Sequence, residues 1–129
     1  MERPRLLLID DEPALADFLA TAARECGYEP AIARNEPDFR HRFNECRPDL
    51  VALDLGMPDT DGVEFLRFLA EQEFRSPVLI ISGFDRRVLE SAFRLGEALG
   101  LHMVGPVEKP ARFEELEELL NRLKPSLAR

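Results

Sequence analysis

The chain has 129 residues, of which 45% are apolar and 33% are charged, and this length and composition are typical of one soluble domain. Its apolar runs, such as residues 6–9 and 78–81, are far shorter than the roughly 20 residues that span a bilayer, and the amino terminus lacks a secretory signal, so we expect a cytoplasmic protein with no membrane partner. The formal net charge of −8 opposes direct binding to nucleic acid, because the phosphate backbone is bound by clustered Lys and Arg.

Short apolar runs alternate with amphipathic stretches along the whole chain. The first helix has Pro13 in its first turn and Gly27 beyond its end, and Asn35 can cap the second helix. Apolar residues at helical spacing predict a third helix before Pro77, a fourth within residues 85–99 and a fifth that ends near Leu123. The predicted strands are residues 5–10, 28–33, 49–55, 77–82 and 102–107.

Regular alternation of strands and helices favours a parallel sheet that is covered by helices on both faces. The chain therefore predicts an α/β fold, a flavodoxin-like doubly wound five-stranded parallel sheet of order 2-1-3-4-5 with five helices. We expect one domain over residues 1–124, with residues 125–129 as a tail or the start of a linker, because Pro125 follows the last helix. Cys26 and Cys46 have no metal-ligand spacing and are interpreted as packing residues.

Polar side chains cluster at the carboxyl ends of the predicted strands. Asp10 and Asp11 follow the first strand, Asp54 ends the third, Ser82 ends the fourth and Lys109 follows the fifth. In this topology strands one and three are neighbours, and ligands bind at their carboxyl ends. Carboxylates about 4 Å apart repel by about 4 kcal/mol at an effective dielectric near 20, so they need a cation or a raised pKa. Magnesium suits this role, since it is commonly bound by one or two carboxylates together with a phosphoryl group.

At these residues the chain resembles the receiver domain of the bacterial two-component response regulators, from Leu6 through the last helix. The segment of residues 94–101, followed by Gly105, also resembles receivers that are fused to cyclic-di-GMP phosphodiesterase domains. The motifs that carry the main resemblance are LLLIDDEP at residues 6–13, DLGMPDTDG at residues 54–62, Ser82-Gly83 and Lys109-Pro110.

The resemblance implies that Asp54 accepts a phosphoryl group from a histidine kinase or phosphotransfer protein and that the switch acts on a downstream output domain or protein. It implies that Mg²⁺ is bound by Asp11 directly, by Asp10 largely through water or hydrogen bonds, and by the backbone carbonyl of Gly56, beside Asp54. Catalytic roles also follow for Ser82, as the hydroxyl switch, and for Lys109, as the phosphoryl ion pair. The family commonly has a cis peptide at the position of Lys109-Pro110, and a homodimer through the fourth and fifth helices is a further expectation.

Two departures from the family pattern concern the output. Pro106 stands where the family usually has Tyr or Phe, and proline removes a backbone donor, so Gly105-Pro106 should alter the pairing of the fifth strand. The segment from Ser82 to Lys109 is longer than usual, and we expect the extra length in the fourth helix. Signalling should therefore depend on the loop after Ser82 and on the fourth helix rather than on a rotating aromatic ring.

Other readings of the same residues stay open at this stage. Residues 11–13 can cap a helix without any metal. The chain can also be a degenerate receiver that serves as a constitutive interaction or dimerisation module. A Mg²⁺-dependent phosphohydrolase with an aspartyl nucleophile is a further alternative, although Asp10 and Asp11 are adjacent where those enzymes usually have a DxD arrangement. In the leading interpretation the protein is a signalling switch and not an enzyme, apart from its own phosphoryl transfer and autodephosphorylation.

Overall fold

Five parallel strands form a single sheet in the order β2-β1-β3-β4-β5. The computed structural model describes residues 3–10, 12–55, 62–82, 86–108 and 112–126. Each strand lies within one residue of its predicted bounds at either end, and the predicted sheet order is confirmed. The strands are β1 (Arg5–Ile9), β2 (Glu29–Ala33), β3 (Leu50–Asp54), β4 (Pro77–Ser82) and β5 (His102–Glu108).

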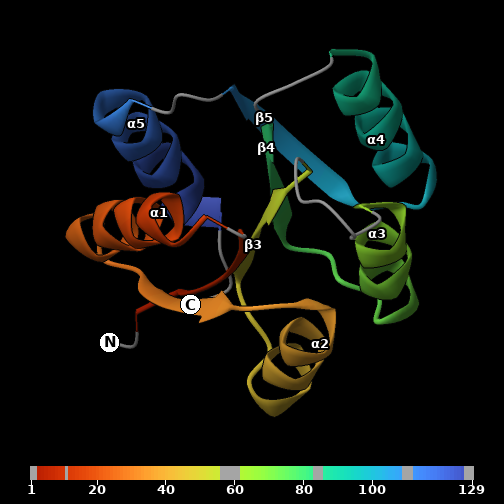
Figure 1. Cartoon of the computed structure of the whole chain (residues 1–129), viewed down its shortest axis with the longest axis horizontal. Helices are drawn as coiled ribbons and strands as arrows, with labels where there is room; N and C mark the ends of the chain where they lie inside the picture. Colours follow the sequence, from red (N-terminus) through yellow and green to blue (C-terminus); the bar gives the residue numbers. More distant parts are fainter. Residues whose placement is uncertain (1–2, 11, 56–61, 83–85, 109–111, 127–129) are drawn as a thin grey trace.

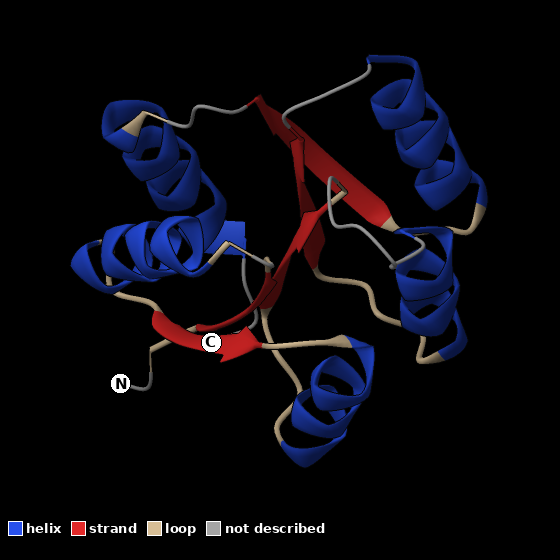
Figure 2. Ribbon diagram, in the orientation of Figure 1, coloured by secondary structure: helices blue, strands red, loops and turns tan. Residues whose placement is uncertain are grey.

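Five helices cover the two faces of the sheet (Figure 1). Figure 2 shows the strands as a central layer, with α1 and α5 on one side and α2, α3 and α4 on the other. A 3₁₀ turn at Lys124–Ser126 continues from the last helix, so ordered structure extends beyond Leu123. The helices are α1 (Pro13–Glu25), α2 (Glu36–Glu45), α3 (Gly62–Glu71), α4 (Arg86–Ala98) and α5 (Phe113–Leu123).

Local sequence signals mark the helix ends as predicted. Pro13 begins α1, and Gly27 lies beyond its end with a φ of 87°, a conformation that glycine adopts without steric cost. The Asn35 side chain accepts a hydrogen bond from the Asp38 backbone N–H at 2.9 Å and so caps α2. Cys26 is buried as predicted, whereas Cys46 is exposed at the end of α2. The interpretation of Cys46 as a packing residue was wrong, because Cys46 follows the last residue of α2 and its side chain is exposed.

A separate hydrophobic core lies on each face of the sheet. Phenylalanines from α2 and α3 dominate one core, where the Phe39 and Phe65 rings meet edge to face with their centroids 5.0 Å apart. Tyr28 is fully buried in the other core, between the sheet and the α1–α5 layer, and its hydroxyl donates a hydrogen bond to the Leu120 backbone oxygen at 2.6 Å. Lys124 Nζ donates to the Cys26 backbone oxygen at 3.0 Å, so two long-range bonds attach the end of α5 to the segment that follows α1.

Tyr28 is expected to stay un-ionised for as long as the chain is folded. Burial, with a smaller contribution from Cys26, raises the pKa of the Tyr28 phenol far above its ordinary value of 10.0. A raised pKa means that the stabilising effect of burial is complete below pH 10 and is lost as the pH rises further. The chain has one Tyr and no Trp, so ultraviolet absorbance of tyrosinate reports this residue alone. Ionisation should coincide with unfolding by circular dichroism, and tyrosinate in the folded protein near pH 10 would contradict this account.

Strand β5 is irregular where Gly105 and Pro106 lie. Leu79 pairs with Val104 and Ile81 with Val107, so one residue of β4 faces two residues of β5. The Gly105–Pro106 peptide is cis, and Gly105 has a φ of 96°. The prediction that these two residues alter the pairing of the strand is confirmed.

Helix α4 packs closely against β5 at Gly96. A Cβ atom at this position would overlap the Met103 thioether, and Gly96 is buried within the helix. Glycine in a helix interior destabilises the helix by about 1 kcal/mol relative to alanine. At position 96 this loss of helix propensity accompanies the close packing of α4 on Met103. The contact sets how near α4 lies to the edge of the sheet.

Replacing Gly96 with Ala should therefore destabilise the protein, because overpacking costs about 1–3 kcal/mol and exceeds the gain in propensity. In a Met103→Ala background the same replacement should stabilise the protein by up to about 1 kcal/mol, since the overlap is removed. Chemical denaturation of the wild-type protein, the two single variants and the double variant measures both effects. A stabilising Gly96→Ala in the presence of Met103 would show that the close approach carries no strain.

Candidate functional site

Two buried carboxylates lie at the carboxyl edge of neighbouring strands. Ile9 pairs with Leu53, so Asp10 and Asp54 occupy the next positions on β1 and β3, whose chains run about 4.8 Å apart. Each aspartate is only 5% exposed. The Leu55 N–H donates to the Ile81 oxygen at 3.0 Å, so the pairing of β3 with β4 continues past Asp54 and fixes its backbone. The sequence prediction that distant aspartates gather at one edge is confirmed for this pair.

Asp10 also contributes to the start of α1. Its Oδ1 accepts a hydrogen bond from the Glu12 backbone N–H at 2.9 Å, while the Glu12 side chain makes no capping bond. Asp10 Oδ2 is buried. The capping hypothesis named residues 11–13, of which Asp11 lies outside the described residues and Glu12 makes no side-chain capping bond. The acceptor at the start of α1 is instead Asp10, which that hypothesis did not include.

Strands β4 and β5 end next to each other at the same edge. Ser82 pairs with Glu108, which places the backbone of Ser82 one strand away from Asp54. The Glu108 carboxylate forms an ion pair with Arg86 at 3.6 Å, and Arg86 begins α4. Sequence reasoning missed this ion pair, since the two residues are 22 positions apart and neither belongs to a motif. It connects the carboxyl end of β5 to the helix that follows Ser82.

Three of the predicted site residues, Asp11, Gly56 and Lys109, lie outside the described residues, as does the Lys109-Pro110 peptide. Within the described part of the chain, no group of three or more His, Cys, Asp and Glu side chains is arranged to hold a metal ion. Asp10 and Asp54 supply two of the carboxylates that such a site requires. These buried, hard oxygen donors fit Mg²⁺, and burial of charged carboxylates is costly unless a cation or hydrogen bonds compensate them.

Pro106 lies on the exposed edge of the sheet between two helices. An open pocket of about 390 Å³ lies beside α4 and β5 and includes Leu89, Phe93 and Pro106 in its lining. A second pocket of about 250 Å³ lies between β5 and α5, with Pro106 and Leu119 among its lining residues. The position that carries an aromatic ring in most receivers thus holds a compact side chain that borders both pockets.

A family model described as "Response regulator receiver domain" matches residues 6–121. The chain belongs to this family. Receivers of this family are generally signalling switches rather than enzymes, and the match supports phosphorylation-controlled signalling as the function of the domain. It lends no support to the phosphohydrolase hypothesis.

Curated relatives of this receiver are response regulators of greater length. It is 32% identical over 125 residues to the transcriptional regulatory protein TrcR of Mycobacterium tuberculosis, covering 97% of this chain and 46% of TrcR. It is 31% identical over 122 residues to the two-component response regulator PhoP of Pseudomonas aeruginosa, and the match covers 92% of this chain and 51% of PhoP. The receiver thus spans about half the length of these relatives.

Solved structures confirm the fold. The receiver domain of the Francisella response regulator 1452 matches with a TM-score of 0.79 and 26% identity, covering 95% of this chain and 98% of that one. The beryllofluoride-activated NtrC4 receiver domain dimer matches with a TM-score of 0.78 and 25% identity, and the match covers 95% of this chain and 97% of that one. In the described part of this receiver, none of the helices has the length and apolar character needed to cross a membrane.

Proposed function

We propose that Asp54 is the phosphoacceptor of this receiver. The observation that carries the proposal is the burial of Asp54 and Asp10 side by side at the carboxyl edge of β1 and β3, in a chain of the receiver family. A carboxylate is a weak nucleophile, so it needs a site that orients it and compensates the charge of the incoming phosphoryl group. The β3–β4 pairing that fixes the backbone of Asp54 supports the orienting part of this role.

In the proposed reaction an Asp54 carboxylate oxygen forms a bond to phosphorus as the bond from phosphorus to the donor breaks. The donor is a phosphohistidine of a histidine kinase or phosphotransfer protein, and its imidazole leaves. Asp10, Asp11, an Asp54 oxygen and the Gly56 carbonyl would hold Mg²⁺, which when bound neutralises charge on the carboxylates and the phosphoryl oxygens. Lys109 would pair with a phosphoryl oxygen, and the Ser82 hydroxyl would donate a hydrogen bond to another. Water then hydrolyses the acyl phosphate in the same site and resets the switch.

The signal would leave this site through the start of α4. Ser82 ends β4, its backbone pairs with Glu108, and Glu108 forms the ion pair with Arg86 at the first position of α4. A shift of Ser82 toward the phosphoryl group would therefore alter the position of α4 relative to β5. Pro106 cannot act as a rotating ring, so we assign the output to this helix movement.

The proposed output is a conformation that a further domain or protein reads. The relatives are longer than this chain, and two of them are named as transcriptional regulatory proteins, which supports an output domain or partner protein in the same pathway. We also propose a homodimer through α4 and α5 and a cytoplasmic location. Membership of the receiver family supports a histidine kinase or phosphotransfer protein as the partner.

Replacement of Asp54 with Asn should reduce phosphorylation to background, because the amide is not a nucleophile. The wild-type protein, incubated with acetyl phosphate and Mg²⁺, should gain a base-labile phosphoryl adduct that intact-mass spectrometry detects. Asp17→Asn, on the exposed side of α1, removes the same charge away from the site and should retain the adduct. Labelling of Asp54→Asn would refute the assignment, and an unlabelled wild-type protein would favour a constitutive interaction module.

Activation should displace α4. With beryllofluoride and Mg²⁺, amide chemical shifts should change in α4, at Leu89 and Phe93, as well as around Asp54, because Arg86 and Glu108 connect the two regions. Arg86→Gln should reduce the shifts in α4 while leaving those around Asp54 in place. Shifts confined to the surroundings of Asp54 in the wild-type protein would contradict the proposed relay.

A further inference from the structure

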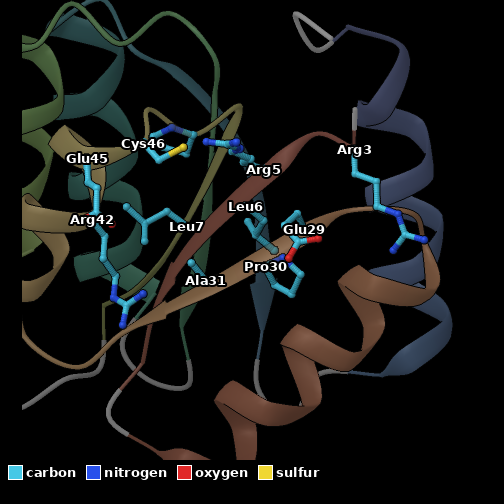
Figure 3. Close-up of a pocket in the computed structure, with 11 residues that line it drawn as sticks. Arg3, Arg5, Leu6, Leu7, Glu29, Pro30, Ala31, Arg42, Glu45 and Cys46 are labelled. Carbon is cyan, nitrogen blue, oxygen red and sulfur yellow. The ribbon is translucent and has the colours of Figure 1, made fainter. Parts of the chain in front are cut away.

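An open cleft of about 530 Å³ lies at the end of the sheet opposite Asp54 (Figure 3). Its walls are the last turn of α2 and the amino-terminal ends of β1 and β2. Arg5 begins β1 and Asp10 follows its fifth residue, so the cleft and the phosphorylation site are about 16 Å apart along the sheet. The cleft belongs to neither the site described above nor the α4–α5 side of the receiver.

The floor of the cleft is apolar. Leu7 and Ala31 pair in register on neighbouring strands and lie on the α2 side of the sheet, with Leu7 buried and Ala31 half-buried. Leu6, Pro30 and Pro48 also contribute to the apolar lining. A cleft of this volume is in the range of sites for small organic molecules, which combine an apolar surface with a few charged groups.

The open edge of β2 argues against an added peptide strand as the occupant. The Glu29 N–H donates to the Pro4 oxygen at 2.8 Å, so alternate residues of β2 direct their donors toward β1. Pro30 therefore faces the open edge, where it has no N–H to offer. A small molecule that binds through side chains fits this cleft better than an extended peptide does.

Arginines stand at opposite ends of the apolar floor. In Figure 3, Arg42 projects from α2 at one end, and Arg5 lies near Cys46 at the other. Arg42 Nε donates to both carboxylate oxygens of Asp38, at 3.1 and 3.2 Å, and within the described chain its terminal amino groups have no other ion-pair partner. Arg5 forms no ion pair with any described residue.

Asp38 keeps Arg42 in place over a wide pH range. The Arg34 backbone N–H, followed by the Arg42 side chain, lowers the pKa of the Asp38 carboxyl against the opposing effect of burial. Glu29 and Glu45 also line the cleft, but both are exposed, and Glu45 faces His41 at 3.3 Å. Exposed carboxylates are screened by water, whereas the Arg42 guanidinium is held toward the cleft by its hydrogen bonds to Asp38.

We propose that this cleft binds an elongated organic dianion, with an anionic group at Arg5, another at Arg42 and a flat apolar body over Leu7 and Ala31. Guanidinium groups bind carboxylate, sulfonate and phosphate alike through paired hydrogen bonds. The two arginines therefore define the charge of the ligand and the spacing of its anionic groups, whichever of these anions it carries. Because the protein carries a net charge of −8, anions are repelled from most of its surface. Binding at this cleft is independent of phosphorylation at Asp54.

The test uses a naphthalene disulfonate with its two sulfonates at opposite ends of the ring system. Its fluorescence is observed against little background, since the chain contains no Trp. Binding should be saturable, and amide shifts should change at Leu7 and Ala31. Arg5→Gln and Arg42→Gln should each weaken binding about 10-fold or more, as expected for loss of a charged hydrogen bond. Arg75→Gln, which removes the same charge from an exposed loop, should leave it unchanged.

Further variants and ligands separate the parts of the proposal. Ala31→Leu fills the floor without a change of charge and should weaken binding as well, and circular dichroism verifies that each variant is folded. Asp54→Asn should bind the disulfonate as the wild-type protein does. Equal affinity for a neutral naphthalene, equal affinity for inorganic sulfate, or shifts at Leu89 and Phe93 in place of Leu7 and Ala31 would each overturn the assignment, as would an absence of binding.

Discussion

The parallel pairing of β1 with β3 is the constraint on which the site depends. It carries Asp10 and Asp54, 44 positions apart in sequence, to neighbouring places at one edge of the sheet and buries both. The apolar faces of the helices cover the remainder of those strands, so water has little access to the carboxylates except at the edge itself. The fold thus concentrates negative charge at the point where a receiver must attract a cation and then a phosphoryl group.

Much of this arrangement could be predicted from the sequence because its signals are local. Continuous apolar runs marked the buried strands, while Pro13, Gly27 and Asn35 marked helix ends through backbone geometry that depends on one or two residues. The alternation of strand and helix predicted a parallel sheet with helices on both faces, and the order 2-1-3-4-5 is that of the flavodoxin-like doubly wound fold. Once that order was known, the edge that holds Asp10, Asp54 and Ser82 followed as well.

The remainder depends on contacts between distant segments, for which the sequence has no local signal. The ion pair of Arg86 with Glu108 requires the relative position of α4 and β5, and that position is set by the contact of Gly96 with Met103. The exposure of Cys46 and the cleft beside Arg5 depend on how far α2 covers the sheet. A cis peptide was expected from the family at Lys109-Pro110, outside the described residues, and the structure has one at Gly105–Pro106.

Both outer strands of the sheet contain a proline, Pro30 in β2 and Pro106 in β5. An outer strand with a complete row of backbone donors is a template on which another chain can form a further strand, and this is a common route to fibrous aggregation. Pro30 removes a donor from one border, and the bulge at Pro106 interrupts the other. Both edges therefore disfavour the addition of a further strand, and we expect molecules that associate with this receiver to recognise its side chains.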